Sequence, residues 1–489
     1  MSENSNTKQA VWVGLSSLFS LGFGIISSMI LSRYFGKNDY GTYKQVLYVY
    51  NTLLLVFTLG LPKAFSYFLP RIPLCESKSL INKITNLFFL LGGLLSIFLY
   101  MCADLFAEFL KNPDLGVALK IFSPVPFLMM PTMGLESILA AYKKTKILTI
   151  YTIVTRMLML VCVVSPVIFF NGSYIQSIIG FIIASLISFF VALYFEYLPI
   201  KNVDHIRCKI SYKEIFEFSL PLLYASLWGV IITSTDQFFI SRYFGRDIFA
   251  EFSNGAMELP FIGMITGACA IVLSPVFSRM SHEKLNPQKE IFPLWMSVFE
   301  KTVKLVYPLV IYCWFFADVI MTILYGQQYE NSYIYFRIKL IANFFTLIVY
   351  APLLINIGKV KYYSNVQMYG VIVLIIFEYL GVQIFDSPYL LTGVSVLCQL
   401  GRIYFMLICV AKFFNLKLYQ LLPIKLIVKI LLPSVIILAI EYYLFLYVFT
   451  MSLMMVLVLS FIIYVGIYFI YTKKIGIDYF SIVEPLIKR

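Results

Sequence analysis

The chain has 489 residues, of which 61% are hydrophobic and only 13% are charged. A soluble domain carries about a quarter charged residues, and part of any folded surface must face water, so this composition excludes a soluble globular protein. The formal net charge of +13 would suit a nucleic-acid-binding protein, but lysine and arginine lie mostly in short gaps between apolar runs. That distribution is typical of a membrane protein, and we expect no nucleic-acid partner.

Apolar runs of the length that spans a bilayer, roughly 20 residues, recur along the whole sequence. They predict an all-α polytopic membrane protein with about 14 transmembrane helices. In chain order, the expected helices cover residues 10–31, 43–69, 81–103, 116–140, 147–169, 174–197, 215–240, 250–278, 294–324, 337–357, 364–385, 389–413, 425–448 and 450–471. The longest polar gaps, 198–214 and 279–293, are too short for a folded domain, so we expect function inside the helical bundle or at its mouths.

Positive charges concentrate in alternate gaps between these helices. With the N-terminus inside, the internal gaps carry half of the lysine and arginine, within 71–83, 143–146, 201–213, 279–289, 359–361, 412–417 and 473–474. The external gaps hold far fewer positive residues. By the positive-inside rule, both termini are predicted to be cytoplasmic.

A five-residue sequence, Ser-Arg-Tyr-Phe-Gly, occurs at 32–36 and again at 241–245. The two copies follow the first and seventh expected helices, so they mark equivalent points of two repeats. Six helices per repeat restore the same orientation, which predicts two parallel six-helix repeats around a central cavity, as in transporters. We expect an N-terminal lobe at 1–200, a C-terminal lobe at 201–418 and two additional helices at 419–489.

No catalytic or cofactor motif occurs in the sequence. P-loop, GxSxG and HExxH patterns are missing, the eight cysteines are scattered, and both histidines fall in polar loops. We therefore predict that the protein is not an enzyme and that it has no catalytic residue, no metal site and no cofactor.

A charge at the centre of a membrane helix costs at least about 2.5–3.5 kcal/mol, and three cationic residues inside expected helices are the most informative. They are Arg156, Arg402 and Lys63, and one interpretation is a cationic lumen that binds an anionic headgroup. The alternative for Arg156 is a structural ion pair with Glu136, since the two lie at similar depths. The alternative for Lys63 is a side chain that extends to the inner interface, and Glu378 is a candidate partner of Arg402.

Further charged residues lie near the outer helix ends. We place Arg33 and Arg242 at the mouth of the predicted cavity. Asp236 precedes Arg242 by six positions, which favours an ion pair between them. The more specific alternative is that Asp236 couples transport to a cation or proton.

Two segments resemble a known family. Residues 32–43 (SRYFGKNDYGTY) resemble the helix 1–2 junction of the polysaccharide transporter family, the Wzx-type flippases of O-antigen and capsule repeat units. Residues 59–64 (LGLPKA) resemble that family's Leu-Gly stretch in helix 2. The family belongs to the multidrug/oligosaccharidyl-lipid/polysaccharide exporter superfamily, whose plan of six, six and two helices covers the chain.

The resemblance implies a flippase or exporter that moves undecaprenyl-diphosphate-linked oligosaccharide repeat units across the bacterial inner membrane by alternating access. It also implies lipid-linked oligosaccharide, membrane lipid, and a polysaccharide polymerase with its export machinery as partners. Two alternatives stay open, an ion-coupled multidrug exporter and a lipid-linked peptidoglycan precursor flippase. The first helix lacks the acidic residue that such exporters often carry, and short loops disfavour a membrane polymerase or ligase.

Overall fold

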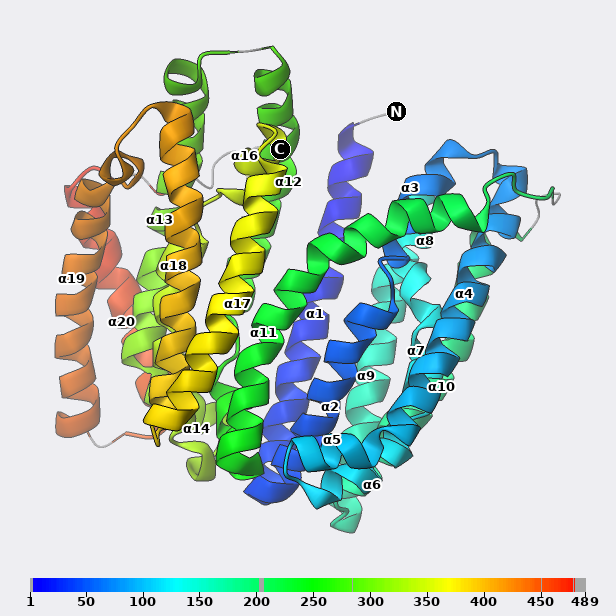
Figure 1. Ribbon diagram of the computed structural model, residues 1–489. Coiled ribbons are helices and arrows are strands. Elements are labelled where there is room, and N and C mark those ends of the chain that lie inside the picture. The colour runs from blue at the N-terminus through cyan, green and yellow to red at the C-terminus, as the bar shows by residue number, and fades with distance from the viewer. Residues whose placement is uncertain (1–2, 202–205, 284, 450, 478, 480–489) are drawn as a thin grey trace. The chain divides into compact units, whose positions relative to one another are not determined.

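The computed structural model describes residues 3–201, 206–283, 285–449, 451–477 and 479. This part of the chain is built from helices, and no strand occurs in it (Figure 1). Contacts group the chain into two compact units, Met1–Ala250 and Glu251–Arg489. In Figure 1, the first unit runs from blue to green and the second from green to red.

The first unit is a helical bundle in which α1 packs along α9, and α9 packs along α10. Its helices are α1 (Glu3–Tyr34), α2 (Lys37–Phe57), α3 (Pro62–Phe68), α4 (Leu74–Met101), α5 (Ala103–Phe109), α6 (Pro113–Phe122), α7 (Val125–Met129), α8 (Leu135–Ala141), α9 (Thr145–Phe170), α10 (Tyr174–Tyr197) and most of α11 (Tyr212–Gly255). Single turns of 3-10 helix lie at η1 (Leu69–Arg71), η2 (Pro131–Gly134) and η3 (Leu198–Ile200).

The second expected helix is broken. Leu59 and Gly60 have positive φ angles of 49° and 71°, and α3 starts at Pro62. A Cβ atom on Gly60 would lie 2.7 Å from the carbonyl oxygen of Ser219 on α11, so the break also allows the backbone to approach α11 closely. The Leu-Gly-Leu-Pro sequence therefore sets a turn between two helices.

The second unit contains α12 (Pro260–His282), α13 (Phe292–Phe315), α14 (Ala317–Tyr325), α15 (Ser332–Thr346), α16 (Ala351–Asn356), α17 (Val360–Ile384), α18 (Pro388–Phe414), α19 (Ile424–Tyr443) and α20 (Leu453–Lys474). Shorter segments are η4 (Pro287–Ile291), η5 (Gln327–Tyr329), η6 (Leu418–Leu421) and η7 (Leu444–Val448). Helix α18 packs against α17 and α15, and α13 packs against α19 (Figure 1).

The ninth expected helix, 294–324, is two helices that meet at a bend of 72° between Phe315 and Ala317. Pro308 lies inside α13, which continues past it. Arg337 stabilises the bend, because its Nε and Nη2 atoms donate to the carbonyl oxygens of Trp314 (2.9 Å) and Phe315 (2.8 Å). Those carbonyl groups would otherwise lack partners at a helix end.

In the described residues, nine helices are long and apolar enough to cross a membrane, and eleven spans result if each of two bent pairs counts as one. The predicted all-α, multi-span membrane fold is thus confirmed. Three further expected spans, 250–278, 337–357 and 425–448, fall on α12, on α15 with α16, and on α19 with η7. The total of about 14 stays a prediction.

Candidate functional site

A cavity of about 500 Å³ lies within the first unit, between α2, α3, η2, α8, α9 and α10. Its wall mixes apolar side chains, such as Leu54, Met159 and Phe181, with many polar ones. The polar lining residues include Asn51, Thr132, Ser137, Thr152, Thr155 and Ser188. A cavity of this size and mixed lining suits part of a small polar ligand.

Arg156 lines this cavity from α9, with an exposed side chain. The neighbouring hydroxyl groups already have hydrogen-bond partners. Thr155 donates to the carbonyl oxygen of Tyr151 (2.8 Å), and the Tyr151 hydroxyl donates to the carbonyl oxygen of Ser188 (3.3 Å). The Arg156 guanidinium forms no hydrogen bond or ion pair with any described residue. Its five N–H donors are therefore available to an anion in the cavity.

Glu136 lines the same cavity from α8, and its side chain is also exposed. No ion pair joins it to Arg156 or to another residue in the described part of the chain. Lys63 directly follows Pro62, which lines the cavity, but its own exposed side chain is not part of the lining. The structure thus brings Arg156 and Glu136 into one cavity and leaves Lys63 beside it.

Arg402 lies on α18 in the second unit, and its side chain packs against α17. Its Nη1 atom donates to Oε1 of Gln367 on α17 at 3.0 Å. A Cβ atom on Gly370 would overlap the methylene groups of Arg402, so the missing side chain at that position makes room for the arginine. Arg402 and Arg156 lie in different units.

The two residues expected at the cavity mouth, Arg33 and Arg242, do not line the 500 Å³ cavity, and neither does Asp236. Arg33 is exposed at the end of α1, and Asp236 is buried on α11. Arg242 donates to the carbonyl oxygen of Phe109 at the end of α5 and lies over the Phe109 ring, 5.3 Å from its centroid. This contact joins α11 to α5.

Ser241, in the second copy of the Ser-Arg-Tyr-Phe-Gly sequence, belongs to a polar network that is buried except at Asp114 and Arg246, and we call this network the α2–α11 clamp. Its members are Thr42, Gln45, Asn112, Asp114, Ser241 and Arg246. Asn112 donates to Thr42 Oγ1 (2.9 Å) and to Gln45 Oε1 (2.6 Å), and Gln45 donates to Ser241 Oγ (2.7 Å).

Arg246 completes the clamp by donating to Asn112 Oδ1 (3.0 Å) and pairing with Asp114. By sequence alone, Arg246 is one of the few positive charges in the external gaps. Its position directly after the repeated pentapeptide was the one available signal of a structural role.

The chain is similar to known proteins both in sequence and in fold. Residues 7–281 match the model of a family described as polysaccharide biosynthesis protein. A putative O-antigen transporter of Shigella flexneri is 22% identical over 189 residues, or 38% of this chain. The match spans 43% of that relative's length.

Solved structures of low sequence identity share the fold. The lipid II flippase MurJ, in an inward closed conformation, superposes with a TM-score of 0.71 at 17% identity, covering 98% of this chain and 100% of MurJ. An inward-facing multidrug resistance transporter of the MATE family gives 0.64 at 12% identity, covering 83% and 98%. A MOP superfamily transporter from Pyrococcus furiosus gives 0.57 at 12% identity, covering 85% and 96%. The fold is that of the multi-span transporters of this superfamily.

Proposed function

The chain belongs to the polysaccharide biosynthesis protein family, and from that membership we propose that it is a flippase for undecaprenyl-diphosphate-linked oligosaccharide repeat units. It moves them across the bacterial inner membrane by alternating access, for O-antigen or capsule synthesis. The similarity to a putative O-antigen transporter supports this cargo. The fold shared with a lipid II flippase supports a lipid-linked substrate.

One observation carries the proposal, the uncommitted guanidinium of Arg156 in a cavity of about 500 Å³. The cargo's diphosphate is a charged group that cannot cross hydrocarbon unaided. An arginine binds phosphate oxygens through two parallel hydrogen bonds, which suits that group. We assign Arg156 to the diphosphate, with Arg402 and Lys63 as further cations along the cargo's path and Arg33 and Arg242 near its mouth.

The proposed partners follow from the cargo. A lipid-linked repeat unit is taken from the cytoplasmic leaflet and passed to a polysaccharide polymerase and the export machinery on the other side. The positive charge of alternate gaps supports cytoplasmic termini. The proposal assigns no catalytic step to this chain.

Two other cargoes have specific support. The similarity to MurJ extends over 98% of the chain, which favours a lipid-linked peptidoglycan precursor. That cargo also carries a diphosphate, so Arg156 would suit it equally. The similarity to a multidrug resistance transporter supports ion-coupled drug export, with Asp236 or Glu136 as the coupling acid.

Deleting the gene in its own host separates these cargoes. The repeat-unit flippase predicts loss of surface polysaccharide, with lipid-linked repeat units accumulating on the cytoplasmic side while their synthesis continues. Plasmid-borne wild-type protein should restore the surface polymer. Normal surface polysaccharide would contradict the proposal; lysis with accumulated peptidoglycan precursor would indicate the second cargo, and drug sensitivity alone the third.

A further inference from the structure

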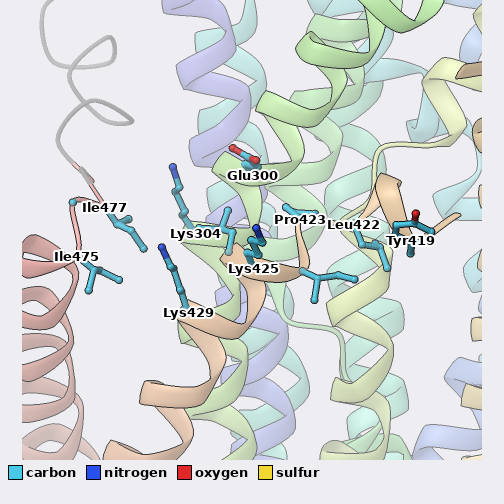
Figure 2. Close-up of a pocket in the computed structure, with 12 residues that line it drawn as sticks. Glu300, Lys304, Tyr419, Leu422, Pro423, Lys425, Lys429, Ile475 and Ile477 are labelled. Carbon is cyan, nitrogen blue, oxygen red and sulfur yellow. The ribbon is translucent and has the colours of Figure 1, made fainter. Parts of the chain in front are cut away.

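A second cavity, of about 620 Å³, lies in the second unit where α13, the segment after η6, the start of α19 and the end of α20 come together (Figure 2). Three lysines line it, Lys304 from α13 and Lys425 and Lys429 from α19. Figure 2 shows them gathered around the pocket with Glu300, the one acidic residue among the described residues that line it. The described lining therefore carries a net charge of +2, from three lysines and one glutamate.

Among the described residues, no neighbour neutralises these charges through an ion pair. None of the three lysines forms an ion pair within the described residues, although Glu300 lies one turn from Lys304 on α13. Lys425 occupies the first turn of α19, where the helix dipole is itself positive and disfavours a cation. Lys429 follows it one turn later on the same helix. An anion in the pocket would relieve this concentration of positive charge.

The remaining wall of the pocket is apolar and continues toward the helices. Leu422, Pro423, Ile424, Ile475 and Ile477 complete much of the lining. The pocket lies level with the first residues of α19 and the last of α20, two adjacent helices that both fall on expected spans. Beyond it these helices expose large apolar side chains, among them Val428, Leu432, Ile436, Ile462 and Ile470. A ligand with an anionic head and an apolar tail suits both surfaces.

We propose that this pocket binds the phosphate group of an anionic lipid, with Lys304, Lys425 and Lys429 around the phosphate and the acyl chains along α19 and α20. Basic pockets at helix ends on the cytoplasmic side of a membrane are suited to such headgroups. Under the predicted topology, Lys473 and Lys474 at the end of α20 are cytoplasmic, so the lipid comes from the inner leaflet. The site is separate from Arg156, which belongs to the other unit.

Native mass spectrometry of the full-length protein in mild detergent tests the proposal, with phosphatidylglycerol and phosphatidylcholine added at equal concentration. The pocket variant is Lys304→Gln/Lys425→Gln/Lys429→Gln. The matched control, Lys359→Gln/Lys361→Gln/Lys412→Gln, removes the same charge from exposed lysines on the same predicted side of the membrane but outside the pocket. We expect wild type and control to retain phosphatidylglycerol selectively. The pocket variant should bind it about fivefold more weakly per lysine, or about a hundredfold in all.

Three results would overturn the proposal. One is equal loss in the pocket and control variants, which would mean that only overall charge attracts the lipid. Another is equal retention of phosphatidylcholine by wild type. The third comes from inorganic diphosphate: if it raises the thermal unfolding midpoint of wild type but not of the pocket variant, and phosphatidylglycerol raises neither, the pocket holds a soluble anion.

Glu300→Gln gives a measurement that does not depend on the triple variant folding. Removing the acidic charge should tighten retention of phosphatidylglycerol about fivefold, and unchanged retention would count against the site. The retention measurements use added phospholipid, so they do not depend on the transported cargo. Their failure would leave the proposed function in place.

Discussion

A Cβ atom on Gly41 would overlap the carbonyl oxygen of Arg246. The backbones of α2 and α11 therefore touch at this point, which only glycine permits. On the same residue, the Arg246 guanidinium binds Asn112 and Asp114. The backbone contact and the polar clamp thus both involve Arg246. Gly41, which belongs to the segment that resembles the family's helix 1–2 junction, contributes to the contact because it has no side chain.

Gly41→Ala should destabilise the first unit. Alanine favours a helix by about 1 kcal/mol over glycine, but forcing α2 and α11 apart costs about 1–3 kcal/mol and strains the clamp. Gly24→Ala on α1 is the control, because a Cβ atom there meets nothing within 4 Å. The thermal unfolding midpoint in detergent and the amount of protein in the membrane should fall for Gly41→Ala only. Equal behaviour of the two variants would refute the close contact.

Asn112→Ala should also lower stability without touching the cavity. Asn112 is 2% exposed, and its loss leaves Thr42, Gln45 and Arg246 short of a partner. Each buried polar group left unsatisfied costs about 1–3 kcal/mol. The exposed Asn38, on the same helix as Thr42, provides the control variant Asn38→Ala. Unfolding midpoints that match between the two would argue against a buried network.

Arg156→Ala should impair polysaccharide export strongly while protein abundance stays near wild type, because the guanidinium supports no described contact. Lysine should rescue export only in part, since an ammonium keeps the charge but loses the planar fork. Val154→Ala, at an exposed apolar position on α9, is the control.

A double variant distinguishes binding from charge pairing at this cavity. If Arg156 binds the diphosphate, Arg156→Ala/Glu136→Gln should leave export impaired. If the arginine serves only to balance Glu136, the double variant should export normally. Surface polymer and protein level, measured side by side, decide between the two roles.

Gly370→Ala should reproduce the effect of Arg402→Ala on export, because a methyl group at position 370 displaces the Arg402 side chain from Gln367. Protein abundance should fall little, as a long side chain can move aside. Gly393→Ala on α18 meets nothing within 4 Å and should export normally. Wild-type export by both Gly370→Ala and Arg402→Ala would remove Arg402 from the cargo path.

Cysteine labelling tests the predicted topology. An impermeant maleimide should label Asp386→Cys in whole cells, and Lys213→Cys only after the membrane is opened, since both positions are exposed. The native Cys208, near Lys213, should react slowly from either side: it is 3% exposed, and burial raises the pKa of its thiol, leaving less reactive thiolate at neutral pH. Labelling of Lys213→Cys in intact cells would reverse the assigned orientation.

The sequence reveals the helices because crossing a bilayer imposes a length and an apolar composition on each one. It does not reveal the bend at Phe316, which depends on Arg337 donating to two carbonyl groups about twenty residues away in sequence. Pro308, which lies inside the ninth expected helix, sits in continuous helix.

The functional residues also divide into those that the sequence reveals and those that it does not. Arg156 stands out because a charge inside an apolar run is rare and costly. Arg246, Lys425 and Lys429 do not, because positive charges near helix ends are expected from topology alone. Only the partners brought from distant segments, such as Asn112 for Arg246 or α13 for the lysines of α19, distinguish them from ordinary loop charges.

The α2–α11 clamp also sets an order for biogenesis. Gln45 and its partner Ser241 are separated by 196 positions in the chain, so at about 5–20 residues per second the ribosome makes them roughly 10–40 s apart. During that interval α2 has been synthesised, but the seventh apolar segment has not. Gln45 and Asn112 therefore lack their partners on α11. The nascent first unit thus reaches its final packing only when Arg246 has been translated and α11 inserted.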